Sequence, residues 1–131
     1  MGADLVAAFP HARVIFAHAD EVLGFPLSEL CFSGPAETLN DTLNTQPALF
    51  VMGVALACAL SEALGDAFQP ACAAGHSLGE LTALTATGAM TFEDGLRLVR
   101  ERGRLMHAAH RRAPGAMAAG LGLDTATPAG I

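Results

Sequence analysis

The sequence contains no Trp, no Tyr and no Lys, and its seven Phe residues are the only large aromatic side chains. Ala, Leu and Val must therefore fill most of any core that the 131 residues build. Hydrophobic residues make up 52% of the chain and charged residues 15%, which is too apolar for a disordered protein. All seven basic residues are Arg, and the net charge of −6 argues against nucleic acid or an anionic membrane as the main partner.

Cysteine is also scarce. Cys31, Cys58 and Cys72 lack the spacing of metal ligands or of a redox motif, so no metal site is expected, and an odd number of thiols indicates a reducing compartment. The N-terminus does not resemble a signal peptide, because it carries Asp4 and no early positive charge. The longest apolar run, Ala48–Leu60, is too short to span a bilayer and is typical of a buried helix. These features predict a soluble, cytoplasmic protein that binds no membrane.

Proline, glycine and capping residues delimit the elements that the sequence predicts. Helices are expected over Pro10–Leu23, Pro35–Thr42, Thr45–Leu64, Leu78–Ala86 and Thr91–Ala109. Two short apolar segments, Pro70–Ala74 and Ala116–Leu121, are candidate strands. A strand followed by a turn and a helix is typical of the α/β class.

The segment Gly75-His76-Ser77-Leu78-Gly79 has the spacing of a nucleophile elbow, in which a strand turns sharply into a helix. Ser77 would then adopt a strained backbone conformation, and side chains at positions 75 and 79 would collide, which requires Gly at both. The backbone N–H of Leu78 would point at the oxyanion that develops when the serine attacks a carbonyl group. The alternative interpretation is a Gly-rich loop between a strand and a helix, without catalysis.

A helical wheel for the segment after Thr91 places Phe92, Leu96, Val99, Gly103 and Met106 on one apolar stripe. Arg97, Arg100 and Arg104 fall on the opposite, outer side with Glu93. Arg102 does not join them, because it lies beside Met106. A guanidinium near an apolar face needs an anionic partner, which predicts an anionic substrate. The alternatives are a salt bridge to a buried carboxylate or a side chain that reaches the surface.

No Ser-His-Asp set is visible in the sequence. His76 flanks the candidate nucleophile but points away from it, so we expect it to form a wall of the site rather than to act as the base. His107 and His110 are expected on the surface, and His11 and His18 have no partner that the sequence identifies.

Several motifs together resemble the malonyl-CoA:acyl-carrier-protein acyltransferase family, in order and spacing, from about Gly2 to Asp124. These motifs are Gly-His-Ser-Leu-Gly-Glu at 75–80, Thr-Gln-Pro-Ala-Leu at 45–49, Gly-Pro-Ala-Glu at 34–37, Arg-Gly-Arg-Leu-Met at 102–106 and Gly-Ala-Met-Ala-Ala at 115–119. The resemblance implies a hydrolase-like α/β core with a parallel sheet and an inserted ferredoxin-like subdomain. Residues 1–112 would belong to the core, and residues 113–131 would begin the subdomain.

The resemblance also implies roles for individual residues. Ser77 would take the malonyl group from malonyl-CoA as an ester, and the phosphopantetheine thiol of acyl carrier protein would collect it for fatty-acid synthesis, with no cofactor or metal. Arg102 would pair with the free malonyl carboxylate, Leu78 would supply one oxyanion N–H, and Gln46 and His76 would line the substrate site.

The sequence departs from the family pattern at two points. The family begins with a strand that ends in a Gly-Gln-Gly loop, and its general-base histidine lies in its C-terminal half; neither occurs in these 131 residues. We therefore expect the chain by itself to be close to inactive. The alternatives are the acyltransferase domain of a polyketide synthase, a non-catalytic remnant, and a serine esterase, which would have no use for the carboxylate-binding Arg102.

Overall fold

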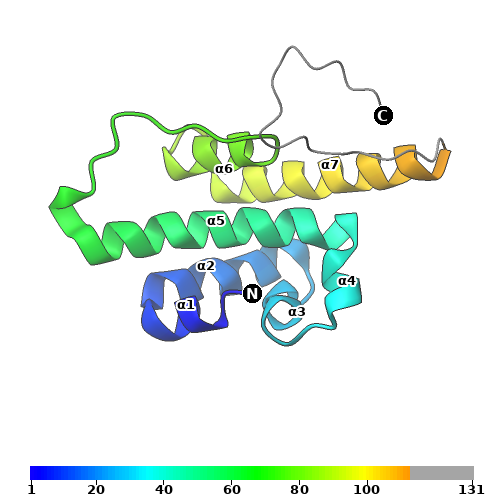
Figure 1. Ribbon diagram of the computed structural model, residues 1–131, viewed down its shortest axis with the longest axis horizontal. Coiled ribbons are helices and arrows are strands. Elements are labelled where there is room, and N and C mark those ends of the chain that lie inside the picture. Colours follow the sequence, from blue (N-terminus) through cyan, green and yellow to red (C-terminus); the bar gives the residue numbers. More distant parts are fainter. Residues whose placement is uncertain (113–131) are drawn as a thin grey trace, which may run out of the picture.

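The computed structural model describes residues 1–112, and the regular structure within this range is entirely helical (Figure 1). The α-helices are α1 (Ala3–Ala8), α2 (Pro10–Leu23), α3 (Leu27–Ser33), α4 (Ala36–Asn40), α5 (Thr42–Leu64), α6 (Gly79–Ala86) and α7 (Phe92–Arg112). A short 3-10 helix, Gly65–Ala67, follows the end of α5. Helices α1 and α3 were not predicted from the sequence.

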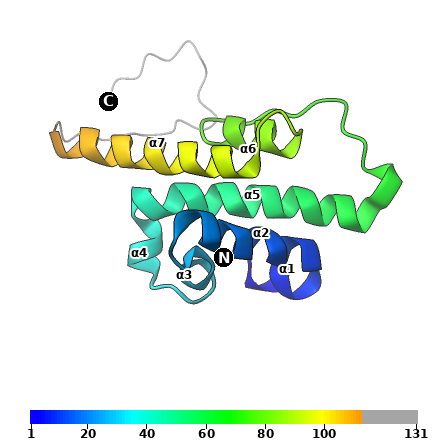
Figure 2. The same cartoon turned by 180° about the vertical axis from the view of Figure 1, so that it is seen from behind.

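Helix α5 runs through the middle of this arrangement, as the two opposite views in Figures 1 and 2 show. Helices α1 to α4 lie on one side of it, and α6 and α7 lie on the other. The core forms where α2, α3 and α7 pack against the first two-thirds of α5. Its buried residues are Ala12, Phe16, Ala19, Leu27, Cys31, Ala48, Phe50, Val51, Val54, Ala55, Leu96 and Val99. Small and aliphatic residues dominate this list, as the composition predicted.

The burial of α5 is uneven along its length. Its buried residues cluster between Gln46 and Ala59, whereas Leu60 and Leu64 near its C-terminal end expose about half of their surface. Within the segment Thr42–Ala67, a stretch of 18 residues has a mean hydropathy of 1.9, so this helix is long and apolar enough to cross a membrane by length and composition alone. The segment Thr42–Ala67 is longer than the apolar run Ala48–Leu60, which is too short to span a bilayer. Its first half nevertheless packs between α2 and α7 in the manner of a core helix.

Glycines let α5 approach its neighbours closely. A Cβ atom on Gly103 of α7 would lie 3.0 Å from the backbone oxygen of Thr42, at the start of α5. A Cβ atom on Gly53 of α5 would lie 2.7 Å from Cγ2 of Thr82 on α6. Both approaches depend on the missing side chain, and they set the spacing between α5 and the two helices that carry the candidate site.

Several predicted helix ends are confirmed. Helix α2 spans Pro10–Leu23 and ends at Gly24, whose φ of 72° is in the left-handed region that favours glycine. The hydroxyl of Thr91 accepts a hydrogen bond from the backbone N–H of Asp94 at 3.2 Å, as expected for the N-cap of α7. Helix α7 then continues to Arg112, beyond the expected end at Ala109.

The predicted start of α5 is wrong by four residues, because the sequence predicted Thr45 as the N-cap and the N-cap is Asp41. The helix begins at Thr42, because the side chain of Asp41 accepts a hydrogen bond from the backbone N–H of Leu43 at 2.8 Å and caps it there. Thr45, the expected cap, lies inside the helix and donates its hydroxyl to the carbonyl of Leu39 at 2.6 Å. Pro47 therefore falls in the second turn, where its missing N–H removes one helical hydrogen bond.

The strand expected at Pro70–Ala74 is not present: these residues form an exposed, irregular segment that leads into the turn at residues 75–79. A strand requires hydrogen bonds to a neighbouring strand, and residues 1–112 offer none. The sheet of the expected α/β core is therefore absent from the part of the chain that the structure describes. The second candidate strand, Ala116–Leu121, and the expected start of a subdomain at residues 113–131 lie outside the described residues.

Candidate active site

Ser77 occupies a sharp turn just before α6. Its φ of 57° makes it the one non-glycine residue with a positive φ among residues 1–112. Most L-residues avoid this conformation, so the surrounding turn must hold it. The backbone N–H of Gly79 donates to the carbonyl of His76 at 2.9 Å, and that of Glu80 donates to the carbonyl of Ser77 at 3.3 Å. The Ser77 side chain is thus presented, exposed, at the N-terminal end of a helix.

The collision expected at the two glycines of the motif occurs at one of them. A Cβ atom on Gly75 would lie 2.0 Å from the backbone carbon and oxygen of Gly79 and 2.6 Å from the backbone nitrogen of Glu80. A Cβ atom on Gly79 would meet no atom within 4 Å in the described part of the chain. The turn therefore requires glycine at position 75, whereas the steric reason given for position 79 is wrong.

The side chain of Arg102 reaches the candidate nucleophile from α7. Its Nη2 atom donates a hydrogen bond to Oγ of Ser77 at 2.9 Å, and its Nη1 atom donates to Oε1 of Gln46 on α5. Arg102 is half-buried, and no carboxylate in residues 1–112 forms an ion pair with it. The structure thus brings together three residues that the sequence analysis selected, from α5, the turn and α7.

Gln46 of α5 binds the second arm of the Arg102 guanidinium. It is the one buried polar residue in the described range, with 7% of its surface exposed. Its Nε2 atom donates to Sδ of Met106 at 3.2 Å, which leaves Oε1 to accept from Arg102. Both ends of the amide are therefore engaged, and the orientation of the amide directs the guanidinium towards Ser77.

The turn also presents the backbone N–H of Leu78. The N–H of Leu78 makes no hydrogen bond to any residue in the range 1–112, and it directly follows Ser77 at the N-terminal end of α6. An unpaired N–H at a helix N-terminus is suited to stabilising negative charge. The His76 side chain is exposed and forms no hydrogen bond within the described residues.

Three of the histidines have carboxylate partners away from Ser77. His11 Nδ1 lies 2.8 Å from Oε2 of Glu62, and His18 Nε2 lies 2.8 Å from Oε1 of Glu93. His107 Nδ1 lies 3.8 Å from Oδ1 of Asp41, and its ring is half-buried rather than on the open surface as expected.

The partners of His11 and His18 could not be identified from the sequence, because each joins elements that are far apart in it. A hydrogen bond from its own backbone N–H and a second from His18 hold the pKa of the Glu93 carboxyl below its ordinary value. His110 is exposed, as expected. No histidine hydrogen-bonds to Ser77 within residues 1–112.

The arginines of α7 divide differently from the expectation. Arg97 and Arg104 lie on the surface, where they pair with Asp94 at 3.7 Å and Glu101 at 2.6 Å. Arg100, expected beside them, instead turns inward and contacts the start of α5. The predicted stripe packs inward at Leu96, Val99 and Gly103, which are buried.

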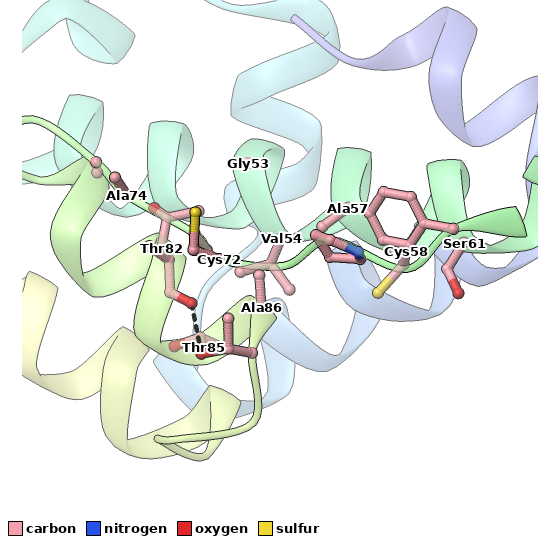
Figure 3. Close-up of a pocket in the computed structure, with 17 residues that line it drawn as sticks. Gly53, Val54, Ala57, Cys58, Ser61, Cys72, Ala74, Thr82, Thr85 and Ala86 are labelled. Atoms are coloured by element: carbon pink, nitrogen blue, oxygen red, sulfur yellow. Dashed lines mark hydrogen bonds between the residues drawn. The ribbon is translucent and has the colours of Figure 1, made fainter.

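A cavity of about 950 Å³ lies beside the turn, between α5, the segment before Gly75, and α6. Figure 3 shows Cys58 and Ser61 of α5 and Thr82 and Thr85 of α6 along it. Its lining is mainly apolar and includes neither Ser77 nor Arg102. Burial raises the pKa of the Cys58 thiol, which disfavours the thiolate. The cavity is therefore separate from the contact between Ser77 and Arg102.

The whole chain has known relatives. Residues 1–129 match a protein family described as "Acyl transferase domain". The chain is 50% identical over its full length to the polyketide biosynthesis protein ThaF of Burkholderia thailandensis, of which it covers 11%. It is 46% identical over 127 residues to the malonyl CoA-acyl carrier protein transacylase of Escherichia coli, covering 97% of this chain and 40% of that protein.

A solved structure extends the comparison. PlMCAT, a malonyl-transacylase solved in complex with the type II PKS acyl-carrier protein AntF, superimposes with a TM-score of 0.77 at 46% identity. The alignment covers 83% of this chain and 35% of that one. The chain thus spans well under half the length of the relatives that it matches.

Proposed function

The chain belongs to the acyl transferase domain family, and we propose that it forms part of an enzyme that moves a malonyl group from malonyl-CoA to acyl carrier protein through an ester on Ser77. The observation that carries this proposal is the contact between Arg102 and Ser77, 2.9 Å between Nη2 and Oγ. A guanidinium beside the proposed nucleophile can form two parallel hydrogen bonds to a carboxylate, so it suits an acyl group that carries a free carboxylate. The malonyl-transacylase names of the relatives support the same activity.

The reaction proceeds in two transfers. In the first, Oγ of Ser77 attacks the thioester carbonyl carbon of malonyl-CoA and loses its proton to a base. The C–S bond breaks, and the CoA sulfur leaves with that proton. In the second, the base takes the proton of the carrier's phosphopantetheine thiol, and the sulfur attacks the ester carbonyl carbon to form a thioester. The bond between that carbon and Oγ breaks, and Ser77 Oγ receives the proton from the base. We assign the base to no histidine of residues 1–112, because none hydrogen-bonds to Ser77 there.

Two groups of the site would stabilise the reacting species. The N–H of Leu78 would donate to the oxyanion of each tetrahedral intermediate, since it has no acceptor within the described residues. Arg102 would exchange its hydrogen bond with Oγ of Ser77 for a bidentate pair with the malonyl carboxylate, while Gln46 keeps the guanidinium in place. This exchange would also release the hydroxyl for attack. His76 would line the entrance, because its side chain is exposed beside the nucleophile.

The same chemistry serves two pathways. Similarity to the Escherichia coli transacylase favours fatty-acid synthesis as the use of the malonyl group. The 50% identity to ThaF and the likeness to PlMCAT favour polyketide synthesis as the second candidate. Both uses require Ser77, Arg102 and a carrier thiol, so they differ in the carrier that is recognised. A comparison of transfer rates to a fatty-acid carrier and to a polyketide carrier separates them.

We further propose that the helices of residues 1–112 cover one side of a hydrolase-like sheet in the longer protein. The apolar cavity beside the Gly75 turn and the exposed leucines of α5 support this, because both are apolar surfaces that residues 1–112 do not bury. The likeness to PlMCAT supports it as well. We place the enzyme in the cytoplasm, where malonyl-CoA and carrier protein are available, and we expect it to need no cofactor beyond its substrates.

The decisive experiment uses a longer version of this protein that covers the length of its relatives. Incubation with malonyl-CoA should add a malonyl ester to the peptide that contains Ser77, and carrier protein should then remove it. Mass spectrometry of the intact and digested protein detects both steps. Failure to form any ester on Ser77 would reject the proposed function.

A further inference from the structure

Pro47 leaves a carbonyl of α5 without its helical partner. In an α-helix the N–H of residue 47 would donate to the carbonyl of residue 43, but proline has no N–H. In this structure Nη1 of Arg100, from α7, donates a hydrogen bond to the carbonyl of Leu43. A side chain from one helix thus replaces the backbone donor that another helix lacks.

Arg100 is held in place by two further contacts. The same Nη1 atom donates to Oδ1 of Asn44 at 3.2 Å, and the guanidinium carbon lies 5.0 Å from the ring centre of Phe25, between α2 and α3. Asn44 in turn donates its Nδ2 atom to the carbonyl of Thr38 at 2.9 Å. The Arg100 guanidinium therefore links α7, the first turn of α5 and the chain segment before α3.

The first two turns of α5 carry the residue that orients Arg102. Gln46 precedes Pro47, and its Oε1 atom accepts a hydrogen bond from Arg102. Arg100 and Arg102 are two residues apart on α7, and both guanidinium groups contact this short part of α5. At Gly103 the two helices approach so closely that a Cβ atom would lie 3.0 Å from the Thr42 carbonyl oxygen. A displacement of the start of α5 would thus move Gln46 relative to Arg102.

We infer that Arg100 is a positioning residue for acyl-group selection. It satisfies the Leu43 carbonyl that Pro47 leaves open, fixes the first turns of α5, and so keeps Gln46 where it directs Arg102 towards Ser77. This inference rests on the proposed malonyl transfer, because it assigns Arg100 to the recognition of the malonyl carboxylate. Arg100 itself contacts neither Ser77 nor Arg102 among the hydrogen bonds of the described residues.

The test compares malonyl and acetyl loading in the longer version of the protein. In Arg100→Met the aliphatic stem remains, but the donors to Leu43 and Asn44 are lost. We expect kcat/KM for malonyl-CoA to fall about tenfold relative to that for acetyl-CoA, because a charge-assisted hydrogen bond is lost and Arg102 is less well oriented. Arg97→Met, which removes an exposed arginine of the same helix, is the matched control and should leave the ratio unchanged.

A second substitution tests the link through the carbonyl. Pro47→Ala restores an N–H that can donate to the Leu43 carbonyl, so it should recover most of the selectivity that Arg100→Met loses. The single variant Pro47→Ala measures the cost of removing the buried ring. If Arg100→Met slows both acyl groups equally, or if Pro47→Ala fails to recover the ratio, the inference is overturned.

The two proposals fail in different ways. A wild-type protein that forms no malonyl ester on Ser77 would reject the proposed function. The thermal unfolding of the Pro47 and Arg100 single and double variants would still report their coupling in that case, because this measurement needs no activity. Additive shifts in unfolding temperature would show that Arg100 does not replace the missing donor.

Discussion

Arg102 and Ser77 are 25 positions apart in the chain, yet Nη2 of the first donates a hydrogen bond to Oγ of the second at 2.9 Å. The arginine comes from the half-buried edge of α7, and the serine comes from a strained turn before α6. Gln46 holds the other arm of the guanidinium from α5. The proposed nucleophile and the guanidinium proposed to bind the malonyl carboxylate thus lie side by side, and four predictions follow from the proposed roles of these residues.

The first prediction concerns the ester itself. Ser77→Ala removes the only atom that the proposal allows to accept the malonyl group. We expect the longer version of the protein to lose all malonyl label from the peptide with residue 77, and transfer to carrier protein should fall to background. Mass spectrometry after incubation with malonyl-CoA measures this directly. Label that persists in Ser77→Ala would show that another residue is the acceptor.

The second prediction concerns Arg102. Because its guanidinium would pair with the malonyl carboxylate in a desolvated site, Arg102→Ala should cost about 2–5 kcal/mol in kcat/KM for malonyl-CoA. Acetyl-CoA has no carboxylate, so its loading should change little or rise. The surface variant Arg104→Ala, which breaks the exposed pair with Glu101, is the control for altered helix charge. Equal losses for both acyl groups in Arg102→Ala would indicate a structural role.

The third prediction separates the two glycines of the turn. Gly75→Ala places a Cβ atom 2.0 Å from the backbone of Gly79, so the turn must shift, at a cost of about 3 kcal/mol or more, and malonyl loading should be lost. Within residues 1–112, the Cβ atom of Gly79→Ala meets no atom within 4 Å, and alanine favours the helix that begins there. We expect its unfolding temperature and loading rate to stay near those of the wild type. Thermal unfolding and loading of both variants provide the test.

The fourth prediction concerns the 131-residue chain by itself. No histidine within residues 1–112 hydrogen-bonds to Ser77, and the N–H of Leu78 is the one group there to which we assign the role of oxyanion donor. The absence of a second such donor typically costs about a hundredfold to a thousandfold, and the absence of a base typically costs about a hundredfold to ten-thousandfold. We expect transfer from malonyl-CoA to carrier protein by this chain to be at least about a hundredfold slower than by the longer version.

The histidines of the chain provide the check on that prediction. His11, His18 and His107 face Glu62, Glu93 and Asp41, so replacing each of them by Gln should leave the small residual rate unchanged. Turnover by the 131-residue chain within tenfold of the longer version would overturn the prediction. The base would then have to be sought among these residues, His76 and His110.

Much of the site could be predicted from local sequence because the constraints there are local. The turn brings the backbone of Gly79 so close to position 75 that no side chain fits there. The glycine in the motif therefore predicts the sharp turn. The caps are local as well: Thr91 contacts the first turn of α7, and Gly24 contacts the last turn of α2. The position of Arg102 beside the apolar stripe followed from helical periodicity alone, and the structure places its guanidinium on Ser77.

Features that depend on a second element were predicted less well. Arg97 and Arg100 fall on the same side of a helical wheel. Only Arg100 turns inward, because its guanidinium contacts the Leu43 carbonyl, which lacks a helical donor at Pro47, and the ring of Phe25. The start of α5 depends on which side chain accepts a hydrogen bond from the N–H groups of its first turn. Asp41 is that acceptor, whereas the hydroxyl of Thr45 donates to the Leu39 carbonyl.

Sequence patterns alone therefore specified five of the seven α-helices of residues 1–112, the strained turn and the chemical type of each candidate site residue, because these follow from steric and periodic constraints within a few residues. Tertiary packing determined that Gln46, Ser77 and Arg102 meet, since that contact requires α5, the turn and α7 to approach to within hydrogen-bonding distance. The same reason explains the missing strand at Pro70–Ala74: an apolar segment becomes a strand only when another strand accepts its hydrogen bonds, and residues 1–112 contain none.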